Sequence, residues 1–380
     1  MVAALARLLD WYRSEALPLW AERGYDRSRG GFHEALGFDG APAEHAERRV
    51  RVQARQIYVF ASADRLGWAA GSGDLARAGF DYFLEKACPD GGARGCVHRM
   101  SAEGQITDDR RDLYDQAFLM LACSAMWRAF REPRAIELAE RTAAFLERDL
   151  APPVGGFLED DRGTRPRRQN PHMHLFEAFM AMNEATGEPA WRARADRMAA
   201  LFERFFFDRE RGVLREFFAD DLSPAKGREG GVIEPGHMAE WVWLLARYER
   251  MSSRTFLNER IALLDNAVRL GADPASGFLV DSIAEGESAS GKARRLWPQT
   301  EYIKALLARS RDGAGTFDRF ADNIAASLFV SYLKQPVKGL WCDQFDGAGT
   351  PIAKDVPASI LYHLFETVQE TQSFLVETNI

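Results

Sequence analysis

Six short stretches of this sequence share one pattern, in which a glycine is followed by one or two apolar residues. They are Gly31-Phe32, Gly95-Cys96-Val97, Gly156-Phe157-Leu158, Gly212-Val213-Leu214, Gly277-Phe278-Leu279 and Gly339-Leu340-Trp341. Successive glycines lie 64, 61, 56, 65 and 62 residues apart. This spacing exceeds the roughly 33–47 residues of the common two-helix solenoid repeats. It accommodates two full helices and a loop that holds a small hairpin, and six such units account for almost the whole chain.

A closed ring of helix pairs is the architecture that this repeat favours. An open array of repeats needs terminal units with a polar outer face, and we find no such unit at either end of the sequence. No low-complexity linker interrupts the repeats. We therefore expect residues 1–380 to form one all-α domain rather than the two that a simple length rule predicts.

The composition indicates a globular protein with a substantial core. Hydrophobic residues make up 46% of the chain and charged residues 28%, and the net charge of −7 argues against a general nucleic-acid binder. No apolar run approaches 18 residues, so we expect no membrane span, and residues 1–20 resemble an amphipathic helix rather than a signal peptide. The four cysteines lack metal-ligand spacing and are too few for a disulfide framework, which favours a reduced, cytoplasmic protein.

Helical periodicity fills the segments between the glycine loops. Segments that are apolar nearly all round are predicted to form an inner ring, and segments with one charged face an outer ring. The predicted inner helices are Ile57–Ala69, Gln116–Arg128, Met173–Ala185, Met238–Glu249, Tyr302–Ala308 and Ile360–Val368, and examples of outer helices are Ile136–Arg148 and Trp191–Phe205.

Proline marks the start of four inner helices, where a first-turn residue needs no amide donor. These prolines are Pro171, Pro235, Pro298 and Pro357, and Asn170 is a candidate N-cap of the first of them. The inner helices of such a ring are parallel. Their first turns therefore meet at one end, where several positive helix-dipole ends favour a substrate that becomes an anion.

Ionisable side chains recur on the inner helices in phase with the glycines. They are Arg55, Asp115, His174, His237, Glu301 and His363, at intervals of 60, 59, 63, 64 and 62 residues. Three of them, His174, His237 and Glu301, are expected in or just after a first turn, and His363 about two turns into its helix. A single buried ionisable residue is usually a hydrogen-bonded core group, but six in register indicate a functional site.

The spacing is tightest around His237. Glu240 follows three residues later and is predicted to orient the imidazole, and Trp243 follows three further on as either a wall for a sugar ring or a core residue. A metal site of His172, His174, His237 and His363 is a weaker alternative. A zinc site needs a tight ligand set, whereas His172 and His174 point in different directions on a helix.

Four motifs together resemble the N-acylglucosamine 2-epimerase superfamily, which includes cellobiose 2-epimerases and mannose isomerases. They are Asn170-Pro-His-Met-His174-Leu-Phe-Glu-Ala, Pro235-Gly-His237-Met-Ala-Glu240-Trp-Val-Trp243, Trp297-Pro-Gln-Thr-Glu301 and Tyr362-His363. The resemblance spans the chain in order, and Arg51-Val-Gln-Ala-Arg55 also looks like the first repeat of that superfamily. It implies an (α/α)6 barrel and interconversion of sugars at carbons 1 and 2, without a metal or another cofactor.

The same resemblance implies roles for particular residues. The histidines matching His237 and His363 form an acid/base pair, Glu240 belongs with them, and Arg55 steadies the enediolate. Substrate-binding positions are implied at Asn170, His174, Trp243, Trp297 and Glu301. Tyr114 and Asp115 are further substrate-binding candidates, Asp115 because it recurs in phase with the other ionisable residues. These roles agree with the chemistry, because abstracting a proton next to a carbonyl needs a base that works near neutral pH and a cation where the oxyanion develops.

The sequence is compatible with more than one sugar substrate and with more than one reaction. The approach to His363 looks closest to mannose and mannose-6-phosphate isomerases, so a mannose/fructose-type isomerase is favoured over a 2-epimerase. A 6-phosphate is an alternative to a neutral sugar, because the segments before three inner helices are basic: Arg162, Arg165, Arg167 and Arg168; Lys226 and Arg228; Lys292, Arg294 and Arg295. A glycosidase using Asp115 and Glu301, or a non-catalytic sugar-binding barrel, is less favoured, and the sequence does not indicate an oligomeric state.

Overall fold

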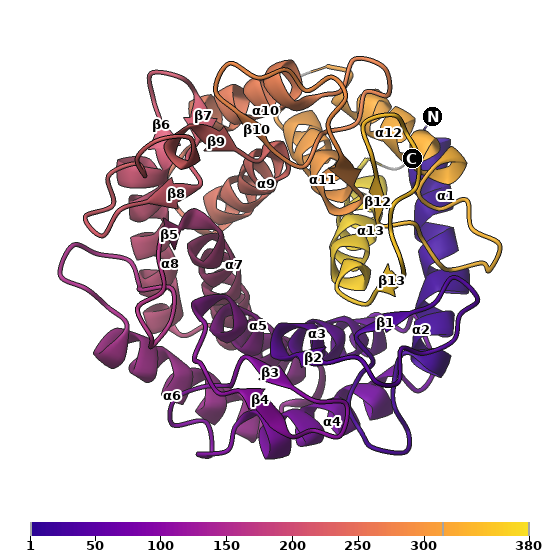
Figure 1. Ribbon diagram of the computed structural model, residues 1–380, viewed down its shortest axis with the longest axis vertical. Coiled ribbons are helices and arrows are strands. Elements are labelled where there is room, and N and C mark those ends of the chain that lie inside the picture. The colour runs from indigo at the N-terminus through magenta and orange to yellow at the C-terminus, as the bar shows by residue number, and fades with distance from the viewer. Residues whose placement is uncertain (1, 314, 379–380) are drawn as a thin grey trace.

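Six inner helices surround the axis of the molecule in the computed structural model, which describes residues 2–313 and 315–378 (Figure 1). They are α3 (Val50–Arg65), α5 (Leu113–Phe130), α7 (Gln169–Thr186), α9 (Pro235–Met251), α11 (Trp297–Arg311) and α13 (Ile360–Glu377). Each is buried along most of its length. This confirms the predicted inner ring of an all-α (α/α)6 barrel.

An outer ring of helices packs against the inner one (Figure 1). It consists of α1 (Ala3–Trp11), α2 (Leu17–Arg23), α4 (Ser72–Tyr82), α6 (Pro133–Asp149), α8 (Pro189–Leu201), α10 (Leu257–Gly271) and α12 (Phe317–Val330). Short π-helical turns, η1 (Tyr12–Ala16), η2 (Phe83–Ala87) and η3 (Phe202–Phe206), extend three of the outer segments. In the described residues, no helix has the length and apolar character that crossing a membrane requires.

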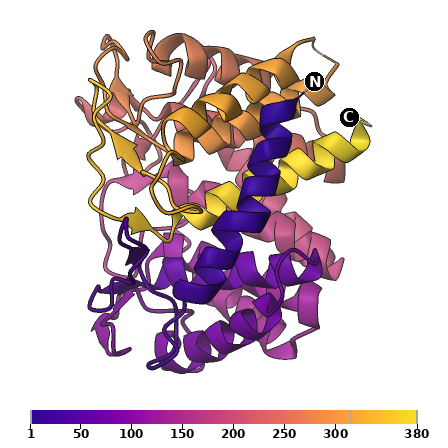
Figure 2. The ribbon, with the colours of Figure 1, turned by 90° about the vertical axis from the view of Figure 1, so that its right-hand side faces the viewer.

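The ring closes between the first and last repeats. Figure 2 shows α1 crossing α13, and the side chain of Asp322 on α12 accepts the amides of Ala4 and Leu5 at 2.8 and 2.9 Å. The Tyr12 hydroxyl donates to the carbonyl of Leu361 at 3.2 Å. These bonds cap the first amides of α1 and join residues more than 300 positions apart in sequence.

The six repeating glycines all adopt the left-handed backbone conformation, with φ between 62° and 86°. At Gly95 a side chain would also be blocked sterically, since a Cβ would lie 1.9 Å from Oε1 of Gln116. That same oxygen accepts the Cys96 amide at 2.9 Å, and Nε2 of Gln116 donates to the Cys96 carbonyl at 2.9 Å. The glycine loop is thereby held against the first turn of an inner helix.

Short antiparallel strand pairs join neighbouring repeats at the end of the barrel where the inner helices begin (Figure 1). The pairs between repeats are β1 (Ala35–Leu36) with β13 (Val356–Pro357), β2 (Arg48–Arg49) with β3 (Arg99–Met100), β5 (Arg167–Arg168) with β8 (Phe217–Phe218), β9 (Val232–Ile233) with β10 (Ile283–Ala284), and β11 (Arg294–Arg295) with β12 (Gln344–Phe345). Two further pairs, β3 with β4 (Ile106–Asp108) and β6 (Phe207–Asp208) with β7 (Val213–Leu214), complete the hairpins, and a 3-10 turn, η4 (Glu229–Gly231), precedes β9.

Several inner helices begin earlier than predicted. The structure starts α3 at Val50 rather than Ile57, because the first turns are polar and therefore escaped a search for apolar periodicity. It starts α7 at Gln169, so Asn170 is the second helical residue and not the N-cap. At the last repeat Pro357 belongs to β13, and α13 begins only at Ile360, which places His363 in its first turn.

Candidate active site

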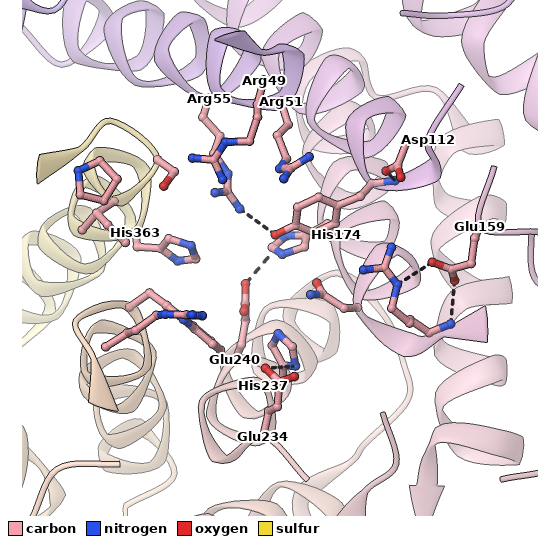
Figure 3. A pocket seen from close by; sticks show the side chains of 18 of the residues that line it. Arg49, Arg51, Arg55, Asp112, Glu159, His174, Glu234, His237, Glu240 and His363 are labelled. Carbon is pink, nitrogen blue, oxygen red and sulfur yellow. Dashed lines mark hydrogen bonds and ion pairs between the residues drawn. The ribbon is translucent and has the colours of Figure 1, made fainter. Parts of the chain in front are cut away.

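A cavity of about 820 Å³ opens where the inner helices begin. It lies within the usual range for small-molecule sites. Figure 3 shows side chains from all sides of the ring pointing into it. Four histidines, seven arginines and five carboxyl residues are among its lining, so the cavity is markedly polar.

Each of the four lining histidines has a carboxylate at its Nδ1 atom. The pairs and distances are His98 with Asp115 at 2.6 Å, His174 with Glu177 at 3.1 Å, His237 with Glu216 at 3.0 Å, and His363 with Glu301 at 2.9 Å. A carboxylate at Nδ1 fixes the ring orientation and tautomer. It leaves Nε2 as the nitrogen available to a substrate in the cavity.

His237 is held in the charged form. Burial alone would lower its pKa, but the carboxylates of Glu216 and Glu234, 3.0 and 3.4 Å from Nδ1, outweigh burial and raise the pKa to about 10. The pKa of Glu234 is itself raised to about 7, chiefly by burial. At neutral pH His237 is therefore an imidazolium that donates hydrogen bonds.

His363 is held in the neutral form. Burial lowers its pKa well below the ordinary value, and the cations Arg55 and Lys304 lower it further. With Nδ1 bonded to Glu301, its Nε2 atom carries a lone pair. His363 is therefore the histidine prepared to accept a proton.

Glu240 does not orient His237, contrary to the prediction from their spacing. Its nearest histidine nitrogen is Nδ1 of His174 at 3.9 Å, and neither of its carboxyl oxygens has a hydrogen-bond partner. Burial, then the charge of Glu301, raises its pKa well above the ordinary value. Glu240 still lines the cavity, and its unbonded carboxyl oxygens are available to a ligand.

Arg55 is the lining arginine that lacks a carboxylate within 4 Å among the described residues. One of its Nη atoms donates to the Tyr114 hydroxyl at 2.9 Å, and the guanidinium lies 4.1 Å from the centre of the Phe118 ring. Its Nε–H is buried without a partner. Figure 3 shows this side chain reaching the cavity opposite Glu240 and His237. Its charge is available to an oxyanion.

The remaining predicted residues divide into two groups. Tyr114, Asn170, His174 and Trp297 line the cavity, and the Trp297 ring lies 5.0 and 5.9 Å from the rings of His237 and His363.

Asp115, Glu301 and Trp243 do not line the cavity, which corrects their predicted contact with a substrate. Asp115 and Glu301 lie behind the histidines that they bond. Trp243 is one turn deeper on α9 than Glu240, and its indole N–H donates to Glu370 at 2.9 Å, so it is a core residue.

His172 is a structural residue. Its Nε2 atom accepts the amide of Phe157 at 2.9 Å, and its Nδ1 donates to the carbonyl of Arg168 at 2.8 Å. Both nitrogens are used, which removes it from the metal set considered above. Three histidine–carboxylate groups in the described residues bring ligand atoms within 4.8 Å of one another, but in each the histidine bonds a carboxylate of the group through Nδ1. The Nδ1 atoms of these histidines are thus occupied by carboxylates.

Three of the seven lining arginines, Arg49, Arg168 and Arg295, are directed into the cavity by the alternation of side chains along short strands. In β2, β5 and β11 two arginines follow each other, and neighbouring strand residues point to opposite sides. The first is buried, as Arg167 is, with Nη atoms donating to backbone carbonyls such as that of Phe157 at 3.0 Å. The second lines the cavity. The lining arginines are Arg49, Arg51, Arg55, Arg110, Arg165, Arg168 and Arg295.

The predicted basic mouth is thus correct for Arg165, Arg168 and Arg295 only. Arg167 and Arg294 are the buried members of their pairs. Arg162 pairs with Asp108 and Asp109, and Arg228 and Lys292 both pair with Glu287. Lys226 is exposed outside the lining.

Three residues of the site were not predicted from the sequence: Glu216, Glu177 and His98. Glu177 follows His174 by three residues, a helical spacing that would have identified it. Glu216 lies between β7 and β8 and His98 lies just before β3, so neither falls in register with the inner helices.

Sugar isomerases and epimerases are among the known proteins that resemble this chain in sequence or in fold. The profile of the N-acylglucosamine 2-epimerase family matches residues 30–367. The chain is 36% identical over 378 residues to the mannose-6-phosphate isomerase of Rhizobium meliloti (strain 1021), covering 97% of this chain and 96% of that one. The crystal structure of a D-mannose isomerase superposes with a TM-score of 0.85 at 21% identity, covering 96% of this chain and 97% of that one. Cellobiose 2-epimerase from Spirochaeta thermophila DSM 6192 superposes with a TM-score of 0.87 at 22% identity, covering 99% and 97%. The chain belongs to the N-acylglucosamine 2-epimerase family and is a sugar isomerase or epimerase.

Proposed function

We propose that the protein is an aldose–ketose isomerase that interconverts a mannose-type sugar with its fructose-type ketose, and that the sugar carries a 6-phosphate. The observation that carries the proposal is the pair of histidines facing one cavity, with the pKa of His237 raised to about 10 and that of His363 lowered. One is an acid and the other a base at the same pH.

His363 moves the carbon-bound proton. Its Nε2 atom takes the proton from C2 of the open-chain aldose, the C–H electrons form the C1–C2 double bond, and the carbonyl oxygen O1 becomes an enediolate oxygen. His363 then returns the proton to C1 on the same face. A general base of this kind contributes about 10² to 10⁴ in rate.

His237 and Arg55 act on the sugar oxygens O1 and O2. The imidazolium of His237 protonates O1 and takes the O2 proton as the C2 carbonyl forms, so no net proton is consumed. Arg55 provides a fixed cation for the negative charge that passes between the two oxygens, and a buried cation acts strongly there because little water screens it.

The opposite protonation of the two histidines favours the isomerase over a C2 epimerase. A reversible epimerase places a base on each face of C2, and the two exchange roles in the two directions. A histidine whose pKa is about 10 is a weak donor toward carbon and a good donor toward oxygen. The two histidines therefore suit a mechanism in which His363 alone transfers the carbon-bound proton, from C2 to C1.

The two carboxyl residues considered for a glycosidase, Asp115 and Glu301, do not line the cavity. A glycosidase needs two carboxyl groups on either side of the bond that breaks. Asp115 and Glu301 are fully buried behind His98 and His363 and are committed to their Nδ1 atoms.

The 6-phosphate is supported by the charge of the cavity lining. Burial is the leading cause of a raised pKa for all five lining carboxyl groups: Asp112, Glu159, Glu234, Glu240 and Asp343. Seven arginines face them. Arg51 lines the cavity from the first turn of α3, and its nearest carboxylate oxygen, on Asp115, lies at 3.3 Å. Arginine binds phosphate well because its planar guanidinium group can donate two hydrogen bonds to it. We propose Arg51 as one phosphate ligand.

The test compares D-mannose with D-mannose 6-phosphate in heavy water by proton NMR, without added metal. We expect fructose 6-phosphate with deuterium at C1, and a higher kcat/KM for the phosphorylated sugar. Arg51→Met should reduce that preference by about 10-fold to 100-fold, the value of a lost charge-assisted hydrogen bond. Arg162→Met is the control, because Arg162 is half exposed and lies outside the cavity lining.

Three results would each contradict a part of the proposal. Glucose as the direct product would identify a 2-epimerase. An unchanged preference in Arg51→Met would remove this arginine from phosphate binding, and equal rates with both sugars in the unaltered enzyme would remove the phosphate from the substrate.

We also propose that residues 1–380 act as one catalytic domain in the cytoplasm. Support comes from the contacts that join the first and last repeats and from four cysteines, all free and buried.

A further inference from the structure

A buried lysine lies directly beneath the cavity. Lys304 on α11 has no exposed surface, and its Nζ atom lies 2.7 Å from Oε2 of Glu301. The same ammonium group lies 3.8 Å from the centre of the Trp243 ring. The other oxygen of Glu301, Oε1, accepts from Nδ1 of His363 at 2.9 Å. Lys304, Glu301 and His363 therefore form one continuous line that ends in the cavity.

Three other glutamates face Lys304 and are occupied differently. Glu177 on α7 accepts from His174 and from the Tyr362 hydroxyl, and Glu366 on α13 accepts from the Tyr58 hydroxyl. Glu240 on α9 has no hydrogen-bond partner, and burial raises its pKa well above the ordinary value. Glu301 is the carboxylate that Lys304 reaches directly.

We infer that Lys304 is a positioning residue: it holds Glu301 ionised, and the ionised carboxylate fixes the His363 tautomer that leaves the Nε2 lone pair facing the cavity. A fully buried carboxyl group without a cation takes up a proton, since burial penalises the charged form. A protonated Glu301 would donate to Nδ1 and move the ring proton to Nε2. His363 would then present a donor where the reaction needs an acceptor. The consequence for catalysis rests on the proposed function, whereas the tautomer itself does not.

The pH dependence follows from the same contacts. The pKa of Glu301 is raised by burial, and Lys304 is the chief group that opposes this rise. Lys304 also lowers the pKa of His363, after burial and Arg55. Removing the ammonium group thus raises the pKa of both residues. Because each must lose a proton for His363 to act as a base, the acid limb of activity must move to higher pH.

The experiment replaces Lys304 by methionine, which keeps the length of the side chain and removes its charge. We expect kcat near neutral pH to fall between about 100-fold and 10,000-fold, the range for a lost orienting group and for a wrong histidine tautomer. KM should change less than about threefold, because Lys304 does not line the cavity. The acid limb of kcat should move to higher pH, and part of the activity should return in alkaline buffer.

A matched control comes from the same helix. Arg309 is also a nearly buried cation with a carboxylate three residues away, at 2.6 Å from Asp312, but it lies at the far end of α11. Arg309→Met should lower thermal stability and leave the acid limb in place. In a Glu301→Gln background, which cannot ionise, Lys304→Met should cost little further activity. An equal loss there, or an unmoved acid limb, would overturn the inference.

Nitrogen-15 NMR of the histidine rings reads the tautomer without any substrate. We expect an unprotonated Nε2 on His363 in the unaltered protein and a protonated Nε2 in Lys304→Met. The same tautomer in both proteins would refute the role of Lys304 even if the sugar substrate proves to be different. Failure of the unaltered protein to isomerise either sugar would refute the proposed function and leave this NMR result to decide the inference.

Discussion

Replacing Glu216 by glutamine removes the carboxylate that holds the proton on His237. The two side chains are 3.0 Å apart and both are nearly buried. At an effective dielectric constant of about 20, unit charges at this distance attract by about 5 kcal/mol. This corresponds to about 4 pKa units at about 1.36 kcal/mol per unit.

Part of this loss is compensated by Glu234. Its carboxylate lies 3.4 Å from Nδ1 of His237, and the charge of Glu216 is one cause of its raised pKa. Without Glu216, Glu234 ionises more readily and supports the imidazolium. We therefore expect the pKa of His237 to fall from about 10 by about 2 to 3 units rather than 4.

The assay is a proton–carbon NMR titration of the histidine rings from about pH 5 to about pH 11, with His237 assigned through His237→Asn. The alkaline limb of kcat should move down in parallel, since His237 must be charged to protonate O1. Glu229→Gln is the control, because Glu229 is exposed on the neighbouring loop. A His237 that still titrates near its original pKa in Glu216→Gln would refute the assignment of Glu216 as its main partner.

Three further predictions concern stability and metals. Between about pH 7 and pH 10 His237 holds a proton in the folded protein that it lacks in the unfolded chain, because its folded pKa of about 10 exceeds its unfolded value of about 6.5. The free energy of unfolding in urea should fall by up to about 1.4 kcal/mol per pH unit in this window, and an equally steep slope in Glu216→Gln would contradict the account. His172→Leu should cost about 1–3 kcal/mol of unfolding free energy, from the buried Phe157 amide that loses its acceptor, with KM unchanged; a large rise in KM would place His172 in the site. Dialysis against a chelator should leave activity intact, and a loss that a divalent metal restores would show that one of the histidine–carboxylate groups binds a metal.

The regular part of the fold was predictable because the chain repeats it. Each glycine that begins a stretch has a positive φ, a requirement that leaves a direct mark on the sequence. The ionisable residues in phase with these glycines led to the cavity, since parallel inner helices begin at one end. His363 was placed one turn too deep, because Pro357 marks the end of a strand and not the start of a helix.

The partners of the histidines were harder to predict because they come from other elements. Glu216 reaches His237 from a loop between two strands, where no helical spacing relates them. Trp243 follows the spacing of His237 and Glu240, but only the first turns line the cavity, so the next turn is core. Helical spacing gives the face of a helix and not the depth at which the cavity ends.

Deuterium placed at C2 of D-mannose 6-phosphate can be followed by NMR during turnover in ordinary water. If His363 carries one proton between C2 and C1, part of the deuterium must appear in fructose 6-phosphate at one stereochemical position of C1, and His363→Asn must abolish the transfer. Glucose 6-phosphate as the first product, formed with loss of the label from C2, would show that two bases act on opposite faces and would contradict the one-base account.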